Sequence, residues 1–283
     1  MRTSFQQVTI VGLGLIGGSL GLALRRRRLA REVIGLSRSQ AMVRRAKARR
    51  AITWGTTDPK RAVQDAELVV LATPVDTIVP QGKRLARWMR PGSVLTDVGS
   101  VKTDIVAALE RSLPRGVAFV GAHPIAGSEQ RGLEAAEARL FEGAVCLLTT
   151  TARTNARALR RVKTLWASLG SEVKTMSPAQ HDRLLAGTSH LSHLAAYCLS
   201  LSLEAGAPRC LPQSFLAATR VAKSDPDLWD DILVSNQVPL RAAMARFERH
   251  WRRLHRLLSK ADRAALRRML AQAKARRDAL ERS

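Results

Sequence analysis

The chain has 283 residues, of which 46% are hydrophobic and 25% charged, a composition that is typical of a globular protein and, at this length, of two domains. Its formal net charge is +24, which favours anionic ligands and would also suit a nucleic acid or a membrane surface. Because the arginines are spread over nearly every segment rather than gathered in one, we expect small anions as ligands and no specific nucleic-acid partner.

The cysteines and the first apolar run indicate in which cellular compartment the protein is expected. Cys146, Cys198 and Cys210 have neither CxxC nor zinc-ligand spacing, which indicates a reduced, cytoplasmic protein. The apolar run 8–24 is similar to a signal peptide or a short membrane span in its length. It contains five glycines and is followed by the arginines at 25–28, so a strand and a packed helix explain it better, and we expect no membrane association.

The first half of the chain alternates between strand-like and helix-like segments. Strands are predicted at 7–11, 32–36, 67–72, 93–97, 117–121 and 144–149, with helices between them at 40–50, 75–89 and 101–113. A helix at 155–169 and a short strand at 172–176 follow. Strands that alternate with helices predict an α/β domain at residues 1–176, built on a mostly parallel sheet with both faces covered.

Only helices are predicted after residue 176. Ser177 with Gln180 forms a capping box that opens the first of them, and Ser259 resembles a second such start. Between the two lies an amphipathic stripe with spacings of four and three residues, made of Leu240, Met244, Phe247, Trp251, Leu254 and Leu258. We therefore expect an all-α domain at 177–283. Its stripe is more apolar than one small helical layer needs, which predicts a homodimer.

A glycine-rich turn joins the first strand to the first helix. It carries the GxGxxG pattern, and its predicted cofactor-binding residues are Gly12, Gly14, Leu15, Ile16 and Gly17. Gly12 makes the tight turn, Gly14 lets the backbone approach a pyrophosphate, and Gly17 lets helix and strand pack closely. Because the pattern follows a strand and opens a helix within a βαβ unit, it predicts a Rossmann-type dinucleotide-binding domain.

The second strand ends in Ser37, Arg38 and Ser39. About 20 residues after the glycine motif, a Rossmann domain that binds NAD usually has an acidic residue for the ribose hydroxyls. This chain has an arginine between two serines, which would hold a 2′-phosphate. We therefore predict NADP as the preferred cofactor, with NAD as the alternative, in which Arg38 is one more surface arginine.

Three further segments have the composition of a substrate site. The sequence TDVGSVK at 96–102 ends a strand, and GAHPIAGSE at 121–129 is expected to end the next one. The carboxyl ends of parallel strands are where ligands bind in open α/β sheets. The third segment, SHLSH at 189–193, lies on the first helix of the second domain.

Together with GLGLIGGSL near the N-terminus, these segments resemble the prephenate/arogenate dehydrogenase family of tyrosine biosynthesis. The similarity covers essentially the whole chain, including His181-Asp182, the segment 219–226 and Trp229. It implies an NAD(P)-dependent oxidative decarboxylation of prephenate to 4-hydroxyphenylpyruvate, with arogenate as the alternative substrate. It also implies dimerisation through the helical domain.

The resemblance assigns roles to individual residues. His123 would be the catalytic base that takes the proton of the ring hydroxyl, and Ser100 would hydrogen-bond near the hydroxyl and the nicotinamide or cap the following helix. Arg220 would bind a substrate carboxylate through its planar guanidinium. His193 and Ser128 would line the substrate pocket. A donating or cationic His193 would favour the keto group of prephenate over the ammonium of arogenate.

Two other functions compete with this interpretation. A β-hydroxyacid dehydrogenase also joins a Rossmann domain to helices, but relies on a lysine in the helical domain. A non-catalytic basic module that binds NADP or nucleic acid would leave His123 unexplained. The chain departs from some family members at 211–216, where they have a glycine-rich loop and a lysine.

Overall fold

The computed structural model of the protein describes residues 5–126, 130–204, 206 and 210–281. The chain forms two compact units, Met1–Asn236 and Gln237–Ser283. The first contains the sheet and the helices that surround it, and the second is a pair of helices. In the described residues, no helix is both long enough and apolar enough to cross a membrane.

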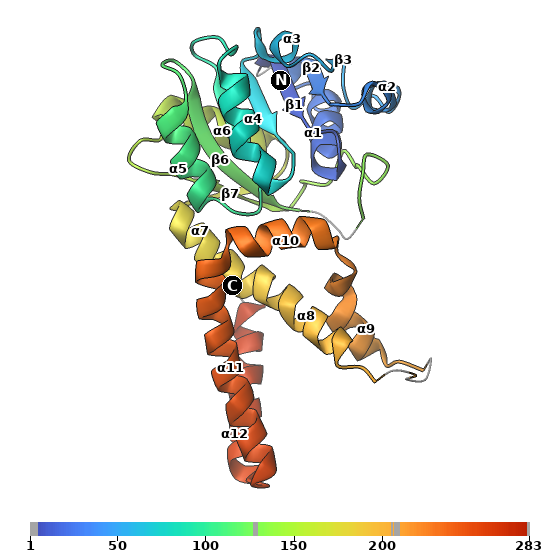
Figure 1. Ribbon diagram of the computed structural model, residues 1–283, viewed down its shortest axis with the longest axis vertical. Helices are drawn as coiled ribbons and strands as arrows, with labels where there is room; N and C mark the ends of the chain where they lie inside the picture. The colour runs from blue at the N-terminus through green and yellow to red at the C-terminus, as the bar shows by residue number, and fades with distance from the viewer. Residues whose placement is uncertain (1–4, 127–129, 205, 207–209, 282–283) are drawn as a thin grey trace. The chain divides into compact units, whose positions relative to one another are not determined.

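An eight-stranded sheet forms the centre of the first unit (Figure 1). Its strands, in the order in which they lie side by side, are β3 (Trp54–Thr56), β2 (Ala30–Leu36), β1 (Phe5–Val11), β4 (Leu68–Leu71), β5 (Val94–Asp97), β6 (Ala118–Ile125), β7 (Val145–Thr149) and β8 (Glu172–Met176). All neighbouring pairs are parallel except β6 and β7. The mostly parallel sheet is confirmed. The edge strand β3 was not predicted, because three residues are too few to show a period.

Helices cover both faces of the sheet. They are α1 (Leu15–Arg26), α2 (Gln40–Ala48), α3 (Pro59–Val63), α4 (Val75–Ala86), α5 (Thr103–Ser112) and α6 (Ala156–Ser168). In β1, Val8 and Ile10 pack into the core that includes α1 and α6, whereas Val11 packs into the core of α4 and α5. This alternation follows from the two-residue period of a strand. Figure 1 shows α4 and α5 in front of the strands and α6 behind them.

The order of the strands determines where a ligand binds. The chain goes from β1 to β2 on one side, and returns to place β4 on the other side of β1. At such a switch point the loops after neighbouring strands diverge, and a crevice opens at the carboxyl ends of the strands. The glycine-rich turn after β1 and the TDVGSVK segment, which begins in the last two residues of β5, lie at this edge.

After β8, the regular structure in the described part of the first unit is helical. It consists of α7 (Pro178–Leu185), a π-helical turn η1 (Ala186–His190), α8 (Leu191–Leu201), α9 (Gln213–Thr219), a 3₁₀ turn η2 (Arg220–Lys223) and α10 (Pro226–Ser235). The predicted capping box is confirmed, because the Ser177 hydroxyl accepts from Gln180 N and the Gln180 side chain accepts from Ser177 N. Helix α7 contacts α5 and β7, and α10 contacts α4.

The second unit consists of α11 (Gln237–Ser259) and α12 (Arg263–Leu280), which lie side by side (Figure 1). The predicted helix start at Ser259 is wrong by three residues. Ser259 ends α11, and Asp262 caps α12 by accepting a hydrogen bond from Ala265 N. Along the predicted stripe, Leu240 is buried, whereas Trp251 is 62% exposed and Leu258 is 59% exposed.

Candidate active site

The glycine-rich turn after β1 has the geometry of a pyrophosphate cradle. Gly12 has φ +92°, and a Cβ added there would lie 2.4 Å from the carbonyl oxygen of Ala72. A Cβ on Gly17 would lie 1.9 Å from the carbonyl oxygen of Gly12, so helix α1 packs directly on the turn. Gly14, the N-cap of α1, has open space within 4 Å of its added Cβ. The first-turn residues Leu15 and Ile16 are half-buried behind it.

A dinucleotide phosphate fits these features. The space at Gly14 adjoins the N-terminus of a twelve-residue helix whose first backbone N–H groups have no intrahelical acceptor. An anion there would be bound by those N–H groups and by the helix dipole. Gly12 and Gly17 are needed for packing, and Gly14 is needed for access.

The turn after β2 has one charged side chain between two hydroxyls. The Ser39 hydroxyl caps α2 by accepting from Met42 N, and the Ser37 hydroxyl accepts from Ser39 N. Both serines therefore shape the turn. Arg38 is exposed at the carboxyl end of β2, and it is the cation of this turn.

The loop after β5 is folded around a buried carboxylate. The side chains of Asp97 and Lys102 form an ion pair with no solvent exposure. Asp97 also accepts hydrogen bonds from Gly99 N at 2.9 Å and from Ala122 N at 3.3 Å. The carboxylate thus ties the loop that carries Ser100 to strand β6, immediately before His123.

Helix α5 is capped from another part of the chain. It begins at Thr103, so the predicted helix start at Val101 is wrong, and so is the idea that Ser100 caps it. Instead, the carboxylate of Asp182 on α7 accepts Lys102 N and Thr103 N, both at 2.8 Å. A carboxylate at a helix N-terminus satisfies free N–H groups and interacts favourably with the helix dipole. Ser100 is left half-buried at the edge of the sheet.

His123 lies inside a strand and not after one. The last pair between β5 and β6 is Thr96 with Val120, and beyond it β6 continues antiparallel to β7, where His123 pairs with Leu147. The expectation that the strand ends before His123 is therefore wrong, because β7 supplies new backbone partners. A histidine on a strand is held more rigidly than one on a loop.

The ring of His123 belongs to a short chain of hydrogen bonds. Its Nδ1 lies 2.9 Å from Nε2 of His181, and Nδ1 of His181 lies 2.8 Å from an Asp182 carboxylate oxygen. His181 has no exposed side-chain surface and Asp182 almost none, whereas His123 is half-buried. The strand histidine is thus connected through α7 to the start of α5.

Burial and hydrogen bonds together set the charges of these three groups. Burial lowers the pKa of His123 well below 6.5, and electrostatic interactions with His181 and Lys102 lower it further. Burial also lowers the pKa of His181, and the hydrogen bond to Asp182 offsets only part of that effect. At Asp182 burial by itself raises the pKa, but the hydrogen bonds from His181, Thr103 and Lys102 outweigh it and leave the pKa below the ordinary value. Both histidines are neutral and Asp182 is ionised at pH 7.

A second cluster contains His193 and Arg220, two of the three predicted substrate-binding residues. The ring of His193 on α8 stacks on Trp229, with 3.4 Å between ring centroids, and His193 Nδ1 donates to the Ser189 carbonyl at 2.9 Å. Burial lowers the pKa of His193, the hydrogen bond to Ser189 raises it in part, and the positive charge of Arg220 lowers it further. Arg220 is exposed in η2, and η2 contacts α8.

The two clusters are joined by a buried amide. The Asn236 side-chain nitrogen lies 2.9 Å from the Asp182 carbonyl oxygen and 2.9 Å from Nδ1 of His190. His190 is buried in the π-helical turn and meets Trp229 edge to face. Such turns are frequent at functional sites. The structure therefore connects His123 and His193 through one continuous set of contacts.

Sequence reasoning missed part of this arrangement. His181, Asp182 and Trp229 entered only as matches to a family pattern, and Asn236 was not singled out. The available signal was the pair His181-Asp182 in the first turns of a helix that had been predicted from its cap. Ser128 was predicted to line the pocket, and it lies outside the described residues.

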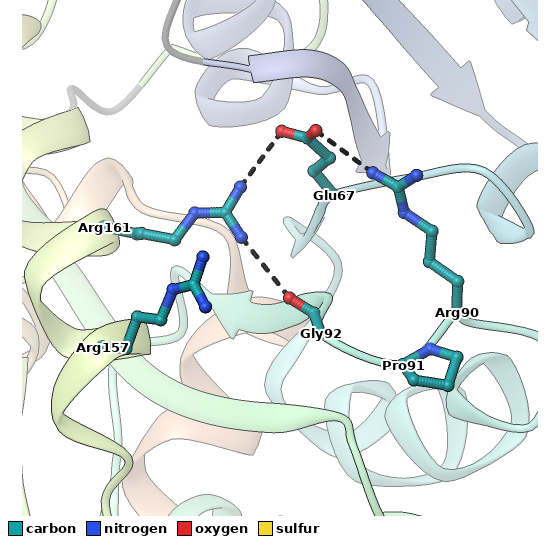
Figure 2. A pocket seen from close by; sticks show the side chains of 6 residues that line it. All are labelled: Glu67, Arg90, Pro91, Gly92, Arg157 and Arg161. Carbon is teal, nitrogen blue, oxygen red and sulfur yellow. Dashed lines mark hydrogen bonds and ion pairs between the residues drawn. The ribbon is translucent and has the colours of Figure 1, made fainter.

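A pocket at the opposite edge of the sheet is basic but is explained by ion pairs (Figure 2). Glu67 precedes β4 and Gly92 precedes β5, so the pocket lies at the amino ends of the strands. Figure 2 shows Glu67 between two arginines. The guanidinium groups of Arg90 and Arg161 each lie 3.1 Å from its carboxylate. Arg161 of α6 also reaches the Gly92 carbonyl, so the cluster fastens this helix to the sheet.

Comparison with known proteins decides the family. The sequence-family model of the prephenate dehydrogenase nucleotide-binding domain matches residues 20–175. The family model of the prephenate dehydrogenase dimerization domain matches residues 177–272. The chain belongs to the prephenate dehydrogenase family. The resemblance inferred from the motifs is thereby confirmed, and so is a Rossmann-type nucleotide-binding domain followed by helices.

Individual relatives of this prephenate dehydrogenase family member cover nearly all of it. It is 33% identical over 267 residues to a cyclohexadienyl dehydrogenase of Zymomonas mobilis subsp. mobilis, a match that spans 92% of this chain and 91% of the relative. A solved prephenate dehydrogenase from A. aeolicus, in complex with hydroxyphenyl propionate and NAD+, has 32% identity and a TM-score of 0.91 over 99% of this chain and 100% of that one. Synechocystis arogenate dehydrogenase has 30% identity and a TM-score of 0.84 over 97% and 100% of the two chains.

Proposed function

We propose that this protein catalyses the NAD(P)-dependent oxidative decarboxylation of prephenate to 4-hydroxyphenylpyruvate. The observation that carries the proposal is a neutral histidine, His123, fixed on β6 at the edge of the sheet where the dinucleotide cradle lies. A nicotinamide bound at this edge would supply the hydride acceptor. A group that is half-buried, unprotonated and at the same edge of the sheet as a cofactor site is suited to general-base catalysis.

The protein's own residues remove one proton and hold the substrate. His123 takes the proton of the ring hydroxyl. At the same time the ring carbon that bears this hydroxyl loses a hydride and becomes a carbonyl carbon. Loss of the opposite carboxylate as CO₂ then sends the electron pair of the broken C–C bond through the ring to the carbonyl oxygen, which takes the proton back from His123. The ring becomes aromatic, which provides the driving force. Ser100, after β5, hydrogen-bonds in the region of the hydroxyl, and Arg220 binds a substrate carboxylate. His193 and Ser128 complete the substrate pocket in this proposal.

The hydrogen bonds of His193 favour a second candidate substrate, arogenate. Because Nδ1 of His193 donates to the Ser189 carbonyl and burial keeps the ring neutral, Nε2 is an acceptor. This differs from the donating histidine that we expected from the sequence. An acceptor would suit the ammonium of arogenate, whereas the keto group of prephenate needs a donor. Prephenate remains the proposed substrate because of the family and the basic chain.

One experiment tests both substrates. The values of kcat/KM for prephenate and for arogenate are measured with NADP⁺ and with NAD⁺, in the wild type and in His193→Val. A higher value for prephenate supports the proposal, and faster turnover of arogenate assigns the alternative. Unchanged selectivity in His193→Val would remove His193 from the choice of substrate. Absence of turnover with either substrate would overturn the function.

The proposed cofactor preference is for NADP. It is supported by the exposed Arg38 at the end of β2 and by the two serines beside it, which carry no negative charge to repel a 2′-phosphate. An aspartate or glutamate would be expected in this turn of an NAD-specific enzyme.

We also propose a homodimer, a cytoplasmic location and a domain boundary near residue 176. The dimer is supported by the family's dimerization domain and by the exposed apolar residues of α11. The location is supported by three cysteines that are all described and all free. The boundary is supported by the two family models, which meet at residues 175 and 177.

A further inference from the structure

The hydrogen bonds around His123 determine which of its two nitrogens carries a hydrogen. The proposed reaction uses neither His181 nor Asp182, yet both are buried and joined by hydrogen bonds to the proposed base. We propose that Asp182 and His181 are positioning residues that hold His123 with its hydrogen on Nδ1, so that Nε2 is the basic nitrogen. This inference rests on the proposed function only in taking His123 as the base.

The argument begins at Asp182, whose carboxylate is an acceptor only. Its two oxygens receive Lys102 N and Thr103 N, each at 2.8 Å, and both of these backbone groups are obligatory donors. A proton on either oxygen would point at an N–H hydrogen. The oxygen that faces His181 is the one that accepts Lys102 N, and it therefore carries no hydrogen.

The next step is His181. Since its Nδ1 lies 2.8 Å from an acceptor, Nδ1 carries the hydrogen and donates it. A neutral imidazole has only one N–H, so Nε2 of His181 has a lone pair. His181 is neutral because its ring is fully buried and burial lowers its pKa. The nitrogen that it presents to His123 is consequently an acceptor.

His123 must then be the donor in the contact between the two rings. Its Nδ1 lies 2.9 Å from the Nε2 lone pair of His181, and only an N–H at Nδ1 makes this an attractive contact. In the other tautomer two lone pairs would face each other inside the protein, where water cannot replace the lost hydrogen bond. The lone pair of neutral His123 is therefore on Nε2.

The same arrangement serves the protonated state. When Nε2 of His123 takes the proton of the ring hydroxyl, the ring becomes a cation whose Nδ1–H continues to donate to His181. The charge of Asp182 lies behind His181 and favours this cation, as a carboxylate does behind the histidine of a Ser-His-Asp triad. No rotation of either ring is needed during the proton transfer, because the same hydrogen bonds stabilise both states.

The contacts that hold His123, His181 and Asp182 in place come from the protein itself. Asp182 is attached to the first turn of α5 by its two backbone hydrogen bonds, and its own carbonyl oxygen accepts a hydrogen bond from Asn236. His123 is held by strand pairing with β7. The tautomer is thus set before the substrate binds, and it is measurable in the unliganded protein.

The direct test is the tautomer of His123 in the full-length wild type. Long-range ¹H–¹⁵N spectra of protein labelled with [¹⁵N]histidine distinguish an Nδ1–H from an Nε2–H ring, and His123→Gln identifies the signals. We expect Nδ1–H for His123 at pH 7.5 without ligand. An Nε2–H ring overturns the proposal, whatever the activity. His190→Gln is the matched control, because it removes a buried histidine that bonds Asn236 and not His123, and it must leave the His123 tautomer unchanged.

Two substitutions at His181 separate positioning from packing. His181→Phe fills the space but has no acceptor, so it should lose the tautomer preference and lower kcat by at least about tenfold, up to the roughly 10²–10⁴-fold that a general base contributes. In His181→Gln, Asp182 attracts the amide N–H₂ group and leaves the amide oxygen for His123 Nδ1–H. This variant should keep the tautomer and a kcat well above that of His181→Phe.

The outcomes separate this inference from the proposed function. Wild-type kcat in His181→Phe, or equal kcat in the two variants, overturns the positioning role. If His181→Phe does not fold, the wild-type spectrum and His181→Gln still decide. Wild-type protein that turns over neither prephenate nor arogenate refutes the proposed function, and the spectrum then tests the tautomer independently.

Discussion

The buried ion pair under the loop after β5 offers a quantitative test of the structure. Asp97 and Lys102 have no exposed side-chain surface, and each is the other's charged partner. The substitution Lys102→Met removes the ammonium and keeps most of the volume of the side chain. It leaves the Asp97 carboxylate in the interior with the backbone N–H groups of Gly99 and Ala122.

The expected loss of stability follows from that geometry. Removing one partner of a buried ion pair costs about 3–5 kcal/mol, since the other charge stays in a medium of low polarity. Because Asp97 keeps two backbone donors, we expect the lower end, about 3 kcal/mol. At about 2–4 °C per kcal/mol, this corresponds to a decrease in Tm of roughly 6–12 °C. The double variant Lys102→Met/Asp97→Asn removes both charges and should be less destabilised than the sum of the two single variants.

The assay is urea unfolding followed by circular dichroism and by tryptophan fluorescence, with the free energy of unfolding extrapolated to water. Lys47→Met is the matched control, because Lys47 is exposed on α2, and it should change stability by less than about 0.5 kcal/mol. The reasoning is refuted if Lys102→Met is as stable as Lys47→Met. Strict additivity of the two single substitutions would equally show that the charges do not interact.

Four further predictions follow from the site and from the helices. Arg38→Ala should raise the KM for NADP⁺ and leave that for NAD⁺ nearly unchanged, because a charge-assisted hydrogen bond contributes about 1.5–3 kcal/mol; a wild-type kcat/KM that is higher with NAD⁺ contradicts this. His123→Ala should lower kcat by roughly 10²–10⁴ while NADP⁺ binding, measured by calorimetry, survives; more than about a tenth of the wild-type kcat, with chemistry rate-limiting, excludes it as the base. Burial lowers the pKa of His190 to about 4, so the native state favours the neutral ring. Its contribution to the free energy of unfolding should be fully present above pH 6.5 and should be lost as the pH drops towards 4, by roughly 3 kcal/mol. In acid unfolding curves, His190→Gln should show a smaller fall than the wild type. Trp251→Glu places a charge in the exposed stripe of α11 and should convert a dimer into a monomer in light scattering; a wild-type monomer at micromolar concentration would rule the dimer out.

Much of the fold was predictable because it depends on neighbours in the sequence. The cradle at Gly12, Gly14 and Gly17 requires only a strand, a turn and a helix in succession. The capping box at Ser177 involves residues three positions apart. The alternation of strands and helices gave the parallel sheet, since parallel neighbours need crossover helices. The predictions were wrong where an element distant in the sequence changed the end of a strand or the start of a helix.

Those errors have a common physical origin. The strand of His123 continues beyond its predicted end because β7, from later in the chain, pairs with it. Helix α5 begins after Ser100 because its free N–H groups find the carboxylate of Asp182 instead of a local cap. A polar group forms its hydrogen bond with the partner that tertiary packing places closest. A partner far away in the sequence cannot be identified from a local sequence pattern.

The sequence by itself determined the family, the nucleotide-binding turn and the histidine proposed as the base, because each is encoded in a short run of residues. Only the tertiary structure decided how that histidine is held. His123 and His181 are 58 positions apart, and Lys102 and Asp182 are 80 positions apart. These contacts exist because α7 packs against both β7 and α5. No local pattern encodes that approach, since it results from burying the apolar surfaces of three elements at once.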